Sequence, residues 1–217
     1  MTRLLIKNIK GLVQVREDNV VYPLAGKAMA HLPIVQNAYI LLSGEHIEGY
    51  GPMEELPSVS GADTIDATGC FVFPSFTDSH THLVFAASRE EEFVLKIRGA
   101  TYQEIAARGG GILHSARKLQ EVSEDELLGS AMARAREIML TGTGAVEIKS
   151  GYGLTVKDEL KMLRVARRIG HETPLSVKTT FLGAHAVPDG FTRKDYVAHV
   201  VQEMIPAVAA ENLADYI

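Results

Sequence analysis

The chain has 217 residues, of which 46% are hydrophobic and 23% are charged, as is ordinary for a globular protein. Its net charge of −5 and lack of any strongly basic stretch argue against nucleic-acid or acidic-membrane partners, and its single cysteine excludes an intramolecular disulfide. Lysines and an arginine interrupt the apolar N-terminal stretch, and no apolar run is long enough to cross a bilayer. We therefore expect a cytoplasmic protein.

Residues 1–66 carry the pattern of a small β domain. The run LLIKNI, residues 4–9, is typical of a short strand. Residues 37–53, NAYILLSGEHIEGYGPM, predict a hairpin whose turn lies at Ser43–Glu45. The turn-rich segment PSVSGAD, residues 57–63, then links this part to the rest of the chain.

Beyond Cys70 the pattern changes to strands that alternate with helices. Apolar runs predict strands at residues 70–76, 145–150 and 175–182. The helices between them have start signals, which are capping boxes at Ser88–Glu91, Thr101–Glu104 and Ser123–Glu126. A further helix is expected from Thr155 to a stop at Gly170, and a last one from about Thr192 with an interruption at Pro206.

This order predicts an α/β fold with a parallel sheet and right-handed crossovers. Two architectures fit it, an open doubly wound sheet and part of a (β/α)8, TIM-type barrel. No glycine-rich dinucleotide fingerprint follows the first strand, which disfavours the open sheet. Gly109–Gly111 follows a helix and lacks the Lys-Ser/Thr of a phosphate loop, so it is interpreted as a flexible turn.

Two histidines, His80 and His82, stand two residues apart at the expected end of the first of these strands. In an extended chain such residues point to the same face, whereas in a helix they diverge by about 200°. Imidazole binds zinc or ferrous iron well, so the pair predicts a metal site, with Asp78 able to orient a ligand. The alternative is that both histidines are ordinary polar residues that close a strand.

Longer blocks of the sequence resemble those of a known enzyme superfamily. The run DATGCFVFPSFTDSHTH, residues 66–82, resembles the signature of the amidohydrolase superfamily that joins a small β domain to the first barrel strand. The blocks HLVFAASREEEF, RGATYQEIAARGGGI, EIKSGYGL, ELKMLRV and TFLGAHAVP are similar to those of the imidazolonepropionase family. Two departures are Ser75, where the superfamily usually has Gly, and TGTGA at residues 141–145 in place of the commoner GVTT.

The resemblance implies a fold and an activity. Residues 1–66 would form the N-terminal part of a β-sandwich-like domain, and residues 67–217 the first half of a metal-dependent (β/α)8 hydrolase barrel. The family hydrolyses the cyclic amide of 4-imidazolone-5-propanoate to N-formimidoyl-L-glutamate in histidine degradation, with water activated by a metal ion, zinc or iron. The implied partner is this small-molecule substrate.

Residue by residue, His80 and His82 match the first two metal ligands of the family. Arg89, Tyr152 and His185 match substrate-binding positions, and Tyr102 is a weaker substrate candidate whose more ordinary role is packing. Arg89 is otherwise a solvated charge of a first helical turn, and Tyr152 otherwise a cover for the barrel mouth.

The chain is short for such an enzyme, because a complete barrel needs about 250 residues. The family's later histidine and aspartate ligands, and with them the catalytic residues, would lie beyond Ile217. We therefore expect an incomplete N-terminal part, completed by a C-terminal fragment or associated as a homodimer. The alternatives are a non-catalytic half-barrel and another amidohydrolase acting on a different cyclic amide.

Overall fold

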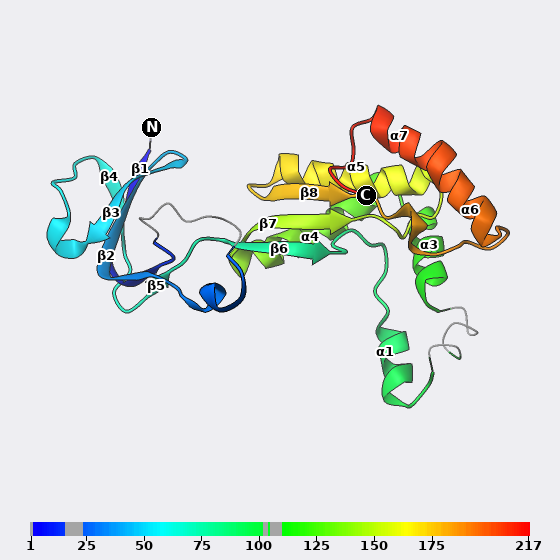
Figure 1. Ribbon diagram of the computed structural model, residues 1–217, viewed down its shortest axis with the longest axis horizontal. Helices are drawn as coiled ribbons and strands as arrows, with labels where there is room; N and C mark the ends of the chain where they lie inside the picture. The colour runs from blue at the N-terminus through cyan, green and yellow to red at the C-terminus, as the bar shows by residue number, and fades with distance from the viewer. Residues whose placement is uncertain (1, 16–23, 102–103, 105–109) are drawn as a thin grey trace. The chain divides into compact units, whose positions relative to one another are not determined.

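A computed structural model describes residues 2–15, 24–101, 104 and 110–217 of the chain. It divides into two compact units, the first ending at Pro74 and the second beginning at Ser75 (Figure 1). None of the helices in these described ranges is long and apolar enough to cross a membrane.

The first unit is built on one five-stranded sheet. Strands β1 and β2, and β2 and β3, pair antiparallel, whereas β4 and β5 both pair parallel with β1, in the order β3-β2-β1-β4. The elements are β1 (Arg3–Val13), η1 (Gly26–Ala30), β2 (Ile34–Ser43), β3 (His46–Pro52), η2 (Met53–Glu55), β4 (Ala62–Asp66) and β5 (Phe71–Val72). The predicted hairpin is confirmed, because β2 and β3 flank a turn in which Gly44 has a φ of 57°.

Strand β1 changes its parallel neighbour halfway along. Residues 3–7 pair with β4, whereas Gly11 and Leu12 pair with β5. Between them the register with β2 shifts at Asn8, whose φ of 56° lies in the left-handed region typical of a bulge. The buried side chains consequently fall into two small cores, one around Leu5 and one around Ile9.

The predicted strand at residues 70–76 is wrong as a single element. Its first part is β5, which belongs to the first unit, where the amide of Lys10 donates to the Cys70 carbonyl over 2.8 Å. The next strand begins only at Phe76. Pro74 lies between the two strands, and proline lacks the N–H that continuous pairing needs. The division of the chain therefore falls after Pro74 rather than after residue 66.

The second unit confirms the alternation of strands and helices, and the fold is mixed α/β. Its three strands are parallel with β7 in the centre, in the order β6-β7-β8 (Figure 1). The elements are β6 (Phe76–Thr81), α1 (Glu90–Ile97), α3 (Ile112–Glu121), α4 (Glu124–Leu140), β7 (Thr143–Lys149), α5 (Val156–Glu172), β8 (Ser176–Thr180), η3 (Gly183–His185), α6 (Arg193–His199), η4 (Val200–Met204) and α7 (Ile205–Ala210).

Most of the predicted helix starts are confirmed. Ser123 and Glu126 form a capping box at the start of α4, and Thr155 and Thr192 cap α5 and α6 with their hydroxyl groups. Thr101 and Glu104 exchange the hydrogen bonds of a capping box as well. The box at Ser88–Glu91 is wrong, because α1 begins after Arg89 and the Ser88 hydroxyl instead bonds Glu90.

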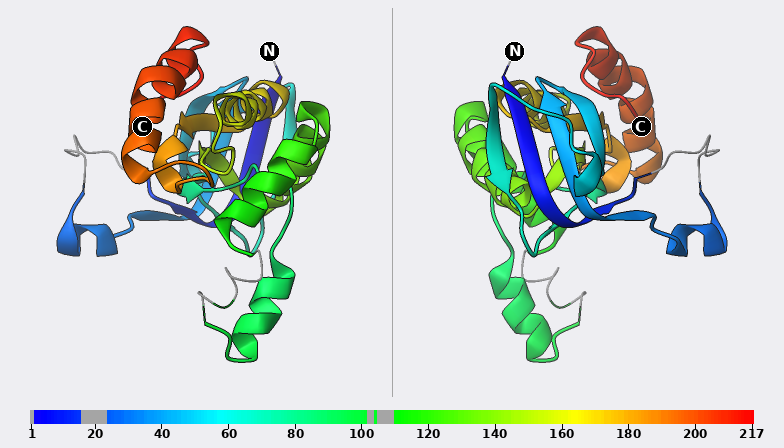
Figure 2. Two further views of the ribbon diagram at one scale, coloured as in Figure 1. Left: turned by 90° about the vertical axis from the view of Figure 1, so that its right-hand side faces the viewer. Right: turned by 90° about the vertical axis from the view of Figure 1, so that its left-hand side faces the viewer.

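Two predicted interruptions have different outcomes. Gly170 does not end α5, which continues to Glu172. A Cβ on Gly170 would lie 3.1 Å from the Cβ of Val177, so glycine here lets the helix approach β8 closely. At Pro206 the interruption is confirmed, because a π-helical turn, η4, separates α6 from α7. These three segments pack beside α5 (Figure 2).

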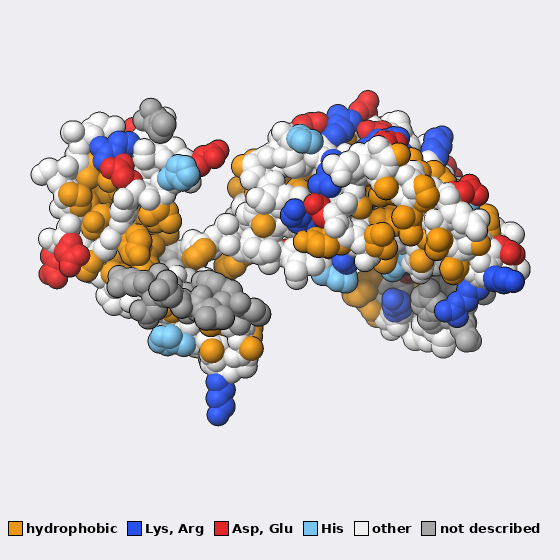
Figure 3. All heavy atoms as spheres, turned by 45° about the horizontal axis from the view of Figure 1, so that its top comes forward, with side chains coloured by type: hydrophobic (Ala, Val, Ile, Leu, Met, Phe, Trp, Pro, Cys, Tyr) orange, Lys and Arg blue, Asp and Glu red, His pale blue; other side chains and the backbone are white. Residues whose placement is uncertain are grey.

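The sheet of the second unit has one covered face and one open face. On the covered face Val146 and Ile148 of β7 join a core with residues of α3, α4 and α5. The intervening Glu147 and Lys149 line an open hollow of about 620 Å³, together with residues of β6 and β8. This alternation follows from the two-residue period of a strand. Figure 3 shows hydrophobic side chains exposed on both units.

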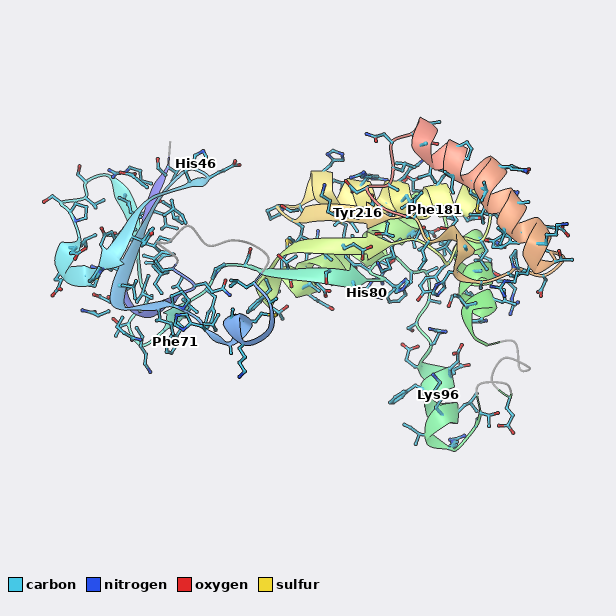
Figure 4. All side chains as sticks on the ribbon, viewed as in Figure 1. His46, Phe71, His80, Lys96, Phe181 and Tyr216 are labelled. Carbon is cyan, nitrogen blue, oxygen red and sulfur yellow. The ribbon has the colours of Figure 1, made fainter. Side chains whose placement is uncertain are left out.

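The last residues return to the sheet beside β8. Tyr216 forms an isolated parallel bridge with Thr180, and its carbonyl accepts the amide of Phe181 over 2.9 Å. The side chains of Tyr216 and Phe181 lie near the end of β8 (Figure 4). Asp215 fixes this return, since its carboxylate accepts the Thr179 amide over 2.9 Å and pairs with Arg167 and Lys178 at 3.1 and 3.0 Å.

The substitution Asp215→Asn is expected to lower the free energy of unfolding at pH 7 by roughly 1 kcal/mol, because the charged hydrogen bonds of the carboxylate are lost. Burial raises the pKa of Asp215, but bonds from Thr179 and Lys178 and the charge of Arg167 outweigh it and hold this pKa below 3.8. The contribution of the carboxylate is therefore present above about pH 4 and is lost as the pH falls through the folded-state pKa. Urea unfolding of both proteins at pH 7 and pH 3 measures this, and an equal difference at both values would contradict it.

Candidate functional site

The histidine pair lies at the carboxyl end of β6. The extended chain expected at the histidine pair is confirmed up to Thr81, where β6 ends, and His82 follows directly. The ring centroids of His80 and His82 are 5.9 Å apart, with His80 exposed and His82 half-buried. Figure 4 labels His80 near the end of β6. Asp78 accepts the backbone amide of His80 over 3.1 Å, so it holds the main chain there rather than a ring nitrogen.

His82 is the centre of a cluster of rings from three different loops. Tyr152, which follows β7, stacks on His82 with centroids 5.0 Å apart and planes 30° apart. His185, which follows β8, lies 5.6 Å from His82 and 5.9 Å from Tyr152. Because β6, β7 and β8 are parallel, their carboxyl ends meet at one edge of the sheet, which is where parallel α/β folds place ligands.

The two glycines beside Tyr152 are required by the loop. Gly151 has a φ of 107°, and a Cβ there would lie 2.9 Å from the carbonyl oxygen of Leu182. A Cβ on Gly153 would lie 2.4 Å from the backbone nitrogen of Glu159. The sequence Gly-Tyr-Gly therefore lets the loop pass close to η3 and to the start of α5 while Tyr152 projects towards His82.

Arg89 lies beside this cluster. It precedes α1, forms a weak ion pair with Glu92 at 3.7 Å, and keeps 41% of its side chain exposed. With His82, Tyr152 and Ser115 it lines a cavity of about 310 Å³, at the small end of the range for ligand pockets. The structure thus brings together five of the six predicted residues; Tyr102 lies outside the described residues.

The half-buried His82 and the exposed His185 both have a lowered pKa, which favours the neutral imidazole. Burial lowers the pKa of His82, and the nearby His185, His80 and Lys149 lower it further, while Glu147 opposes them. Burial and then the positive charge of Arg89 lower the pKa of His185. Neutral imidazole is the form that binds metals, and it can also donate or accept a hydrogen bond from a bound molecule.

The donor set fits part of a metal site. The Nδ1 atom of His82 is buried and has no hydrogen-bond partner, so one nitrogen of the ring lacks any other role. His80, on the same strand, provides a second imidazole. Among the described residues no group of three or more His, Cys, Asp or Glu side chains is placed to hold a metal ion. A catalytic zinc site usually has three protein ligands, so two of them fit here.

Two supporting residues of the site were not predicted from the sequence. Arg134 of α4 donates to the carbonyls of Leu83 and Phe85 over 2.8 and 3.0 Å and holds the segment after His82. Glu159 of α5 is fully buried and binds the loop that carries Tyr152. In the sequence both look like ordinary helix-surface charges, and only the long-range packing reveals their partners.

Gly153→Ala is expected to destabilise the second unit by about 1–3 kcal/mol, because the new methyl group would overlap the backbone of α5. Displacement of the loop would also separate Tyr152 from His82. The matched control is Gly129→Ala in α4, where a Cβ meets nothing within 4 Å. That change is expected to stabilise the helix by up to about 1 kcal/mol. Thermal unfolding measures both, and similar effects of the two changes would contradict the close approach.

Several solved structures have a fold similar to that of this chain. The N-isopropylammelide isopropylaminohydrolase of Burkholderia multivorans covers 99% of the chain with a TM-score of 0.55 and 19% identity. Guanine deaminase of E. coli covers all of it with a TM-score of 0.57 and 12% identity. The chain matches 44% and 45% of these two proteins. A mutant atrazine chlorohydrolase from Arthrobacter aurescens, TM-score 0.55, was solved in complex with zinc and atraton.

Sequence similarity relates the chain to curated imidazolonepropionases. No protein-family model matches the chain. Curated imidazolonepropionases do: that of Flavobacterium johnsoniae is 48% identical over 215 residues, or 98% of the chain, and that of Christiangramia forsetii 49% identical over 216 residues, or 99%. The chain is thus homologous to the imidazolonepropionases, a family of enzymes, and matches their N-terminal half. It spans about half the length of these relatives, 52% in both cases.

Proposed function

We propose that this chain is the N-terminal part of a metal-dependent cyclic amidohydrolase that converts 4-imidazolone-5-propanoate to N-formimidoyl-L-glutamate. The observation that carries the proposal is the meeting of His82, Tyr152 and His185 at one end of three parallel strands. The identity of 48–49% to curated imidazolonepropionases across nearly the whole chain supports the choice of substrate.

His80 and His82 would hold the metal ion. The unpartnered, buried Nδ1 of His82 and its lowered pKa support this role, and the zinc in the atrazine chlorohydrolase structure is consistent with it. Zinc and iron both suit this donor type. A bound metal ion would supply Lewis-acid activation of water for attack on an amide carbonyl at neutral pH. Further ligands and the general base would come from outside the described residues.

Arg89, Tyr152 and His185 would bind the substrate. The planar guanidinium of Arg89 can hold the propanoate by paired hydrogen bonds, and it lines the same cavity as Tyr152 and His82. The Tyr152 ring can stack on the flat imidazolone, and the neutral His185 can exchange a hydrogen bond with a ring heteroatom. Ser115 adds a hydroxyl group to the wall of the cavity.

In this proposal the parallel strands are the first strands of a (β/α)8 barrel, and the open face with Glu147 and Lys149 is its interior. The first unit is then the N-terminal part of a β-sandwich-like domain. A C-terminal fragment, or association as a homodimer, would cover the open face. The setting would be cytoplasmic, without nucleic-acid or membrane partners.

Metal binding is expected to depend on both histidines. After incubation with zinc or ferrous iron and removal of free metal, the purified chain should retain metal that the double variant His80→Ala/His82→Ala loses, because two of the ligands are gone. His199→Ala is the matched control, since His199 on α6 lies apart from the ring cluster and pairs with Glu203. Equal metal content in the double variant and the unchanged chain would remove the ligand assignment.

Turnover is expected only when the rest of the enzyme is supplied. The chain alone should leave the ultraviolet absorbance of 4-imidazolone-5-propanoate unchanged, whereas its mixture with the C-terminal half of a homologous imidazolonepropionase should consume it. Arg89→Met in the mixture should raise KM at least tenfold, because the carboxylate loses a charged partner. An assembled, metal-loaded mixture that leaves the substrate unchanged would contradict the proposed substrate.

A further inference from the structure

We propose that Glu159 is a positioning residue that fixes Tyr152 and His185 relative to each other. It binds the loop of Tyr152 directly and the loop of His185 through Ser150. Its meaning for substrate binding rests on the proposed function, whereas the structural claim stands by itself. Glu159 touches neither the ring cluster nor the cavity, so it acts through the backbone.

The first loop is bound directly. One carboxylate oxygen of Glu159 accepts the amides of Gly153 and Leu154 over 2.7 and 2.9 Å, and the other accepts the amide of Gly151 over 2.9 Å. Tyr152 thus stands between two residues whose amides are held by the same side chain. Leu154, with a φ of 57°, adopts a conformation that needs such support.

The second loop is reached through Ser150. The Ser150 hydroxyl hydrogen-bonds Glu159 and also accepts the amide of Leu182 over 3.0 Å. Leu182 immediately precedes η3, which carries His185. The Ser150 hydroxyl therefore donates to the Glu159 carboxylate and accepts the Leu182 amide of the second loop. One buried acid thus holds the loop of Tyr152 directly and the loop of His185 through Ser150.

A second contact ties the same two loops. Tyr196 of α6 donates its hydroxyl proton to the carbonyl of Gly183 over 2.7 Å, and the Leu154 carbonyl lies 3.4 Å away. Tyr196 and Glu159 are each at most 1% exposed. Gly151 completes the approach, because its missing side chain leaves room for the Leu182 carbonyl and the Cβ of His185.

The burial of this carboxylate carries a cost in free energy. Burial raises the pKa of Glu159, and its four hydrogen-bond donors oppose this rise without cancelling it. An apolar residue at this position would avoid the cost of desolvating a carboxylate. The carboxylate has two acceptor oxygens, whereas an amide side chain has one and an apolar side chain has none. These acceptors bind the loop whose Tyr152 stacks on His82.

Amide hydrogen exchange of the metal-free chain, read residue by residue, tests the assignment. Glu159→Ala should speed exchange at Gly151, Gly153 and Leu154 at least tenfold while Ile148 in β7 stays protected. Glu159→Gln has one acceptor oxygen, so it should keep the protection of Gly153 and Leu154 and lose that of Gly151. Asp158→Asn, the neighbouring buried carboxylate, is the control and should leave all three amides unchanged.

Ring contacts provide the second measurement. With ring-labelled Tyr and His, magnetisation transfer between Tyr152 and His185 should weaken at least twofold in Glu159→Ala and also in the milder Ser150→Ala, which frees only the Leu182 amide. Faster exchange throughout the second unit with unchanged ring contacts would reduce Glu159 to a packing role and overturn the inference. Neither readout needs metal or substrate. These results, together with an assembled, metal-loaded mixture that leaves 4-imidazolone-5-propanoate unchanged, would therefore refute the proposed function and leave this inference intact.

Discussion

The parallel pairing of β7 with both of its neighbours is the constraint on which the candidate site depends. Strands that run in one direction end at one edge, so the segments after β6, β7 and β8 converge although they are far apart in sequence. His82, Tyr152 and His185 each follow one of these strands and meet as a ring cluster for this reason. The covered face, with Val146 and Ile148 in its core, stabilises the pairing, while the open face carries the polar residues.

The polar residues near the site are buried in specific partnerships. Glu147 pairs with Lys149 at 2.8 Å on the open face, and Lys161 reaches the carbonyls of Leu119 and Val122 from α5. Arg134 stacks on Phe85, with its guanidinium carbon 3.8 Å from the ring centroid, while it binds the main chain after His82. Unpaired polar groups would be costly at such depth. The bonds of Arg134 fix the segment after His82, and those of Lys161 fix the end of α3 and Val122.

Local chemistry made much of this predictable from the sequence. Features that depend on neighbouring residues were predicted: the hairpin at Gly44, the helix caps at Ser123 and Thr155, and the extended chain at His80. Predictions failed where distant contacts decide. Phe71 and Val72 pair with β1 instead of extending the next strand, and Gly170 stays helical because Val177 packs against it. Of the residues that resemblance alone predicts to bind substrate, Arg89, Tyr152 and His185 do lie around His82. A buried acid such as Glu159 has no sequence signal that separates it from a surface charge.

The central claim is that the edge of this sheet holds a metal ion through His80 and His82. X-ray absorption at the zinc edge of the zinc-loaded chain tests it most directly, because imidazole gives a characteristic scattering pattern around the metal. The account predicts two imidazole nitrogens at about 2.0–2.1 Å from the zinc ion. The scattering of both imidazoles should be lost in the double variant His80→Ala/His82→Ala. A coordination shell of oxygen atoms alone, or an imidazole pattern unchanged in the double variant, would contradict it.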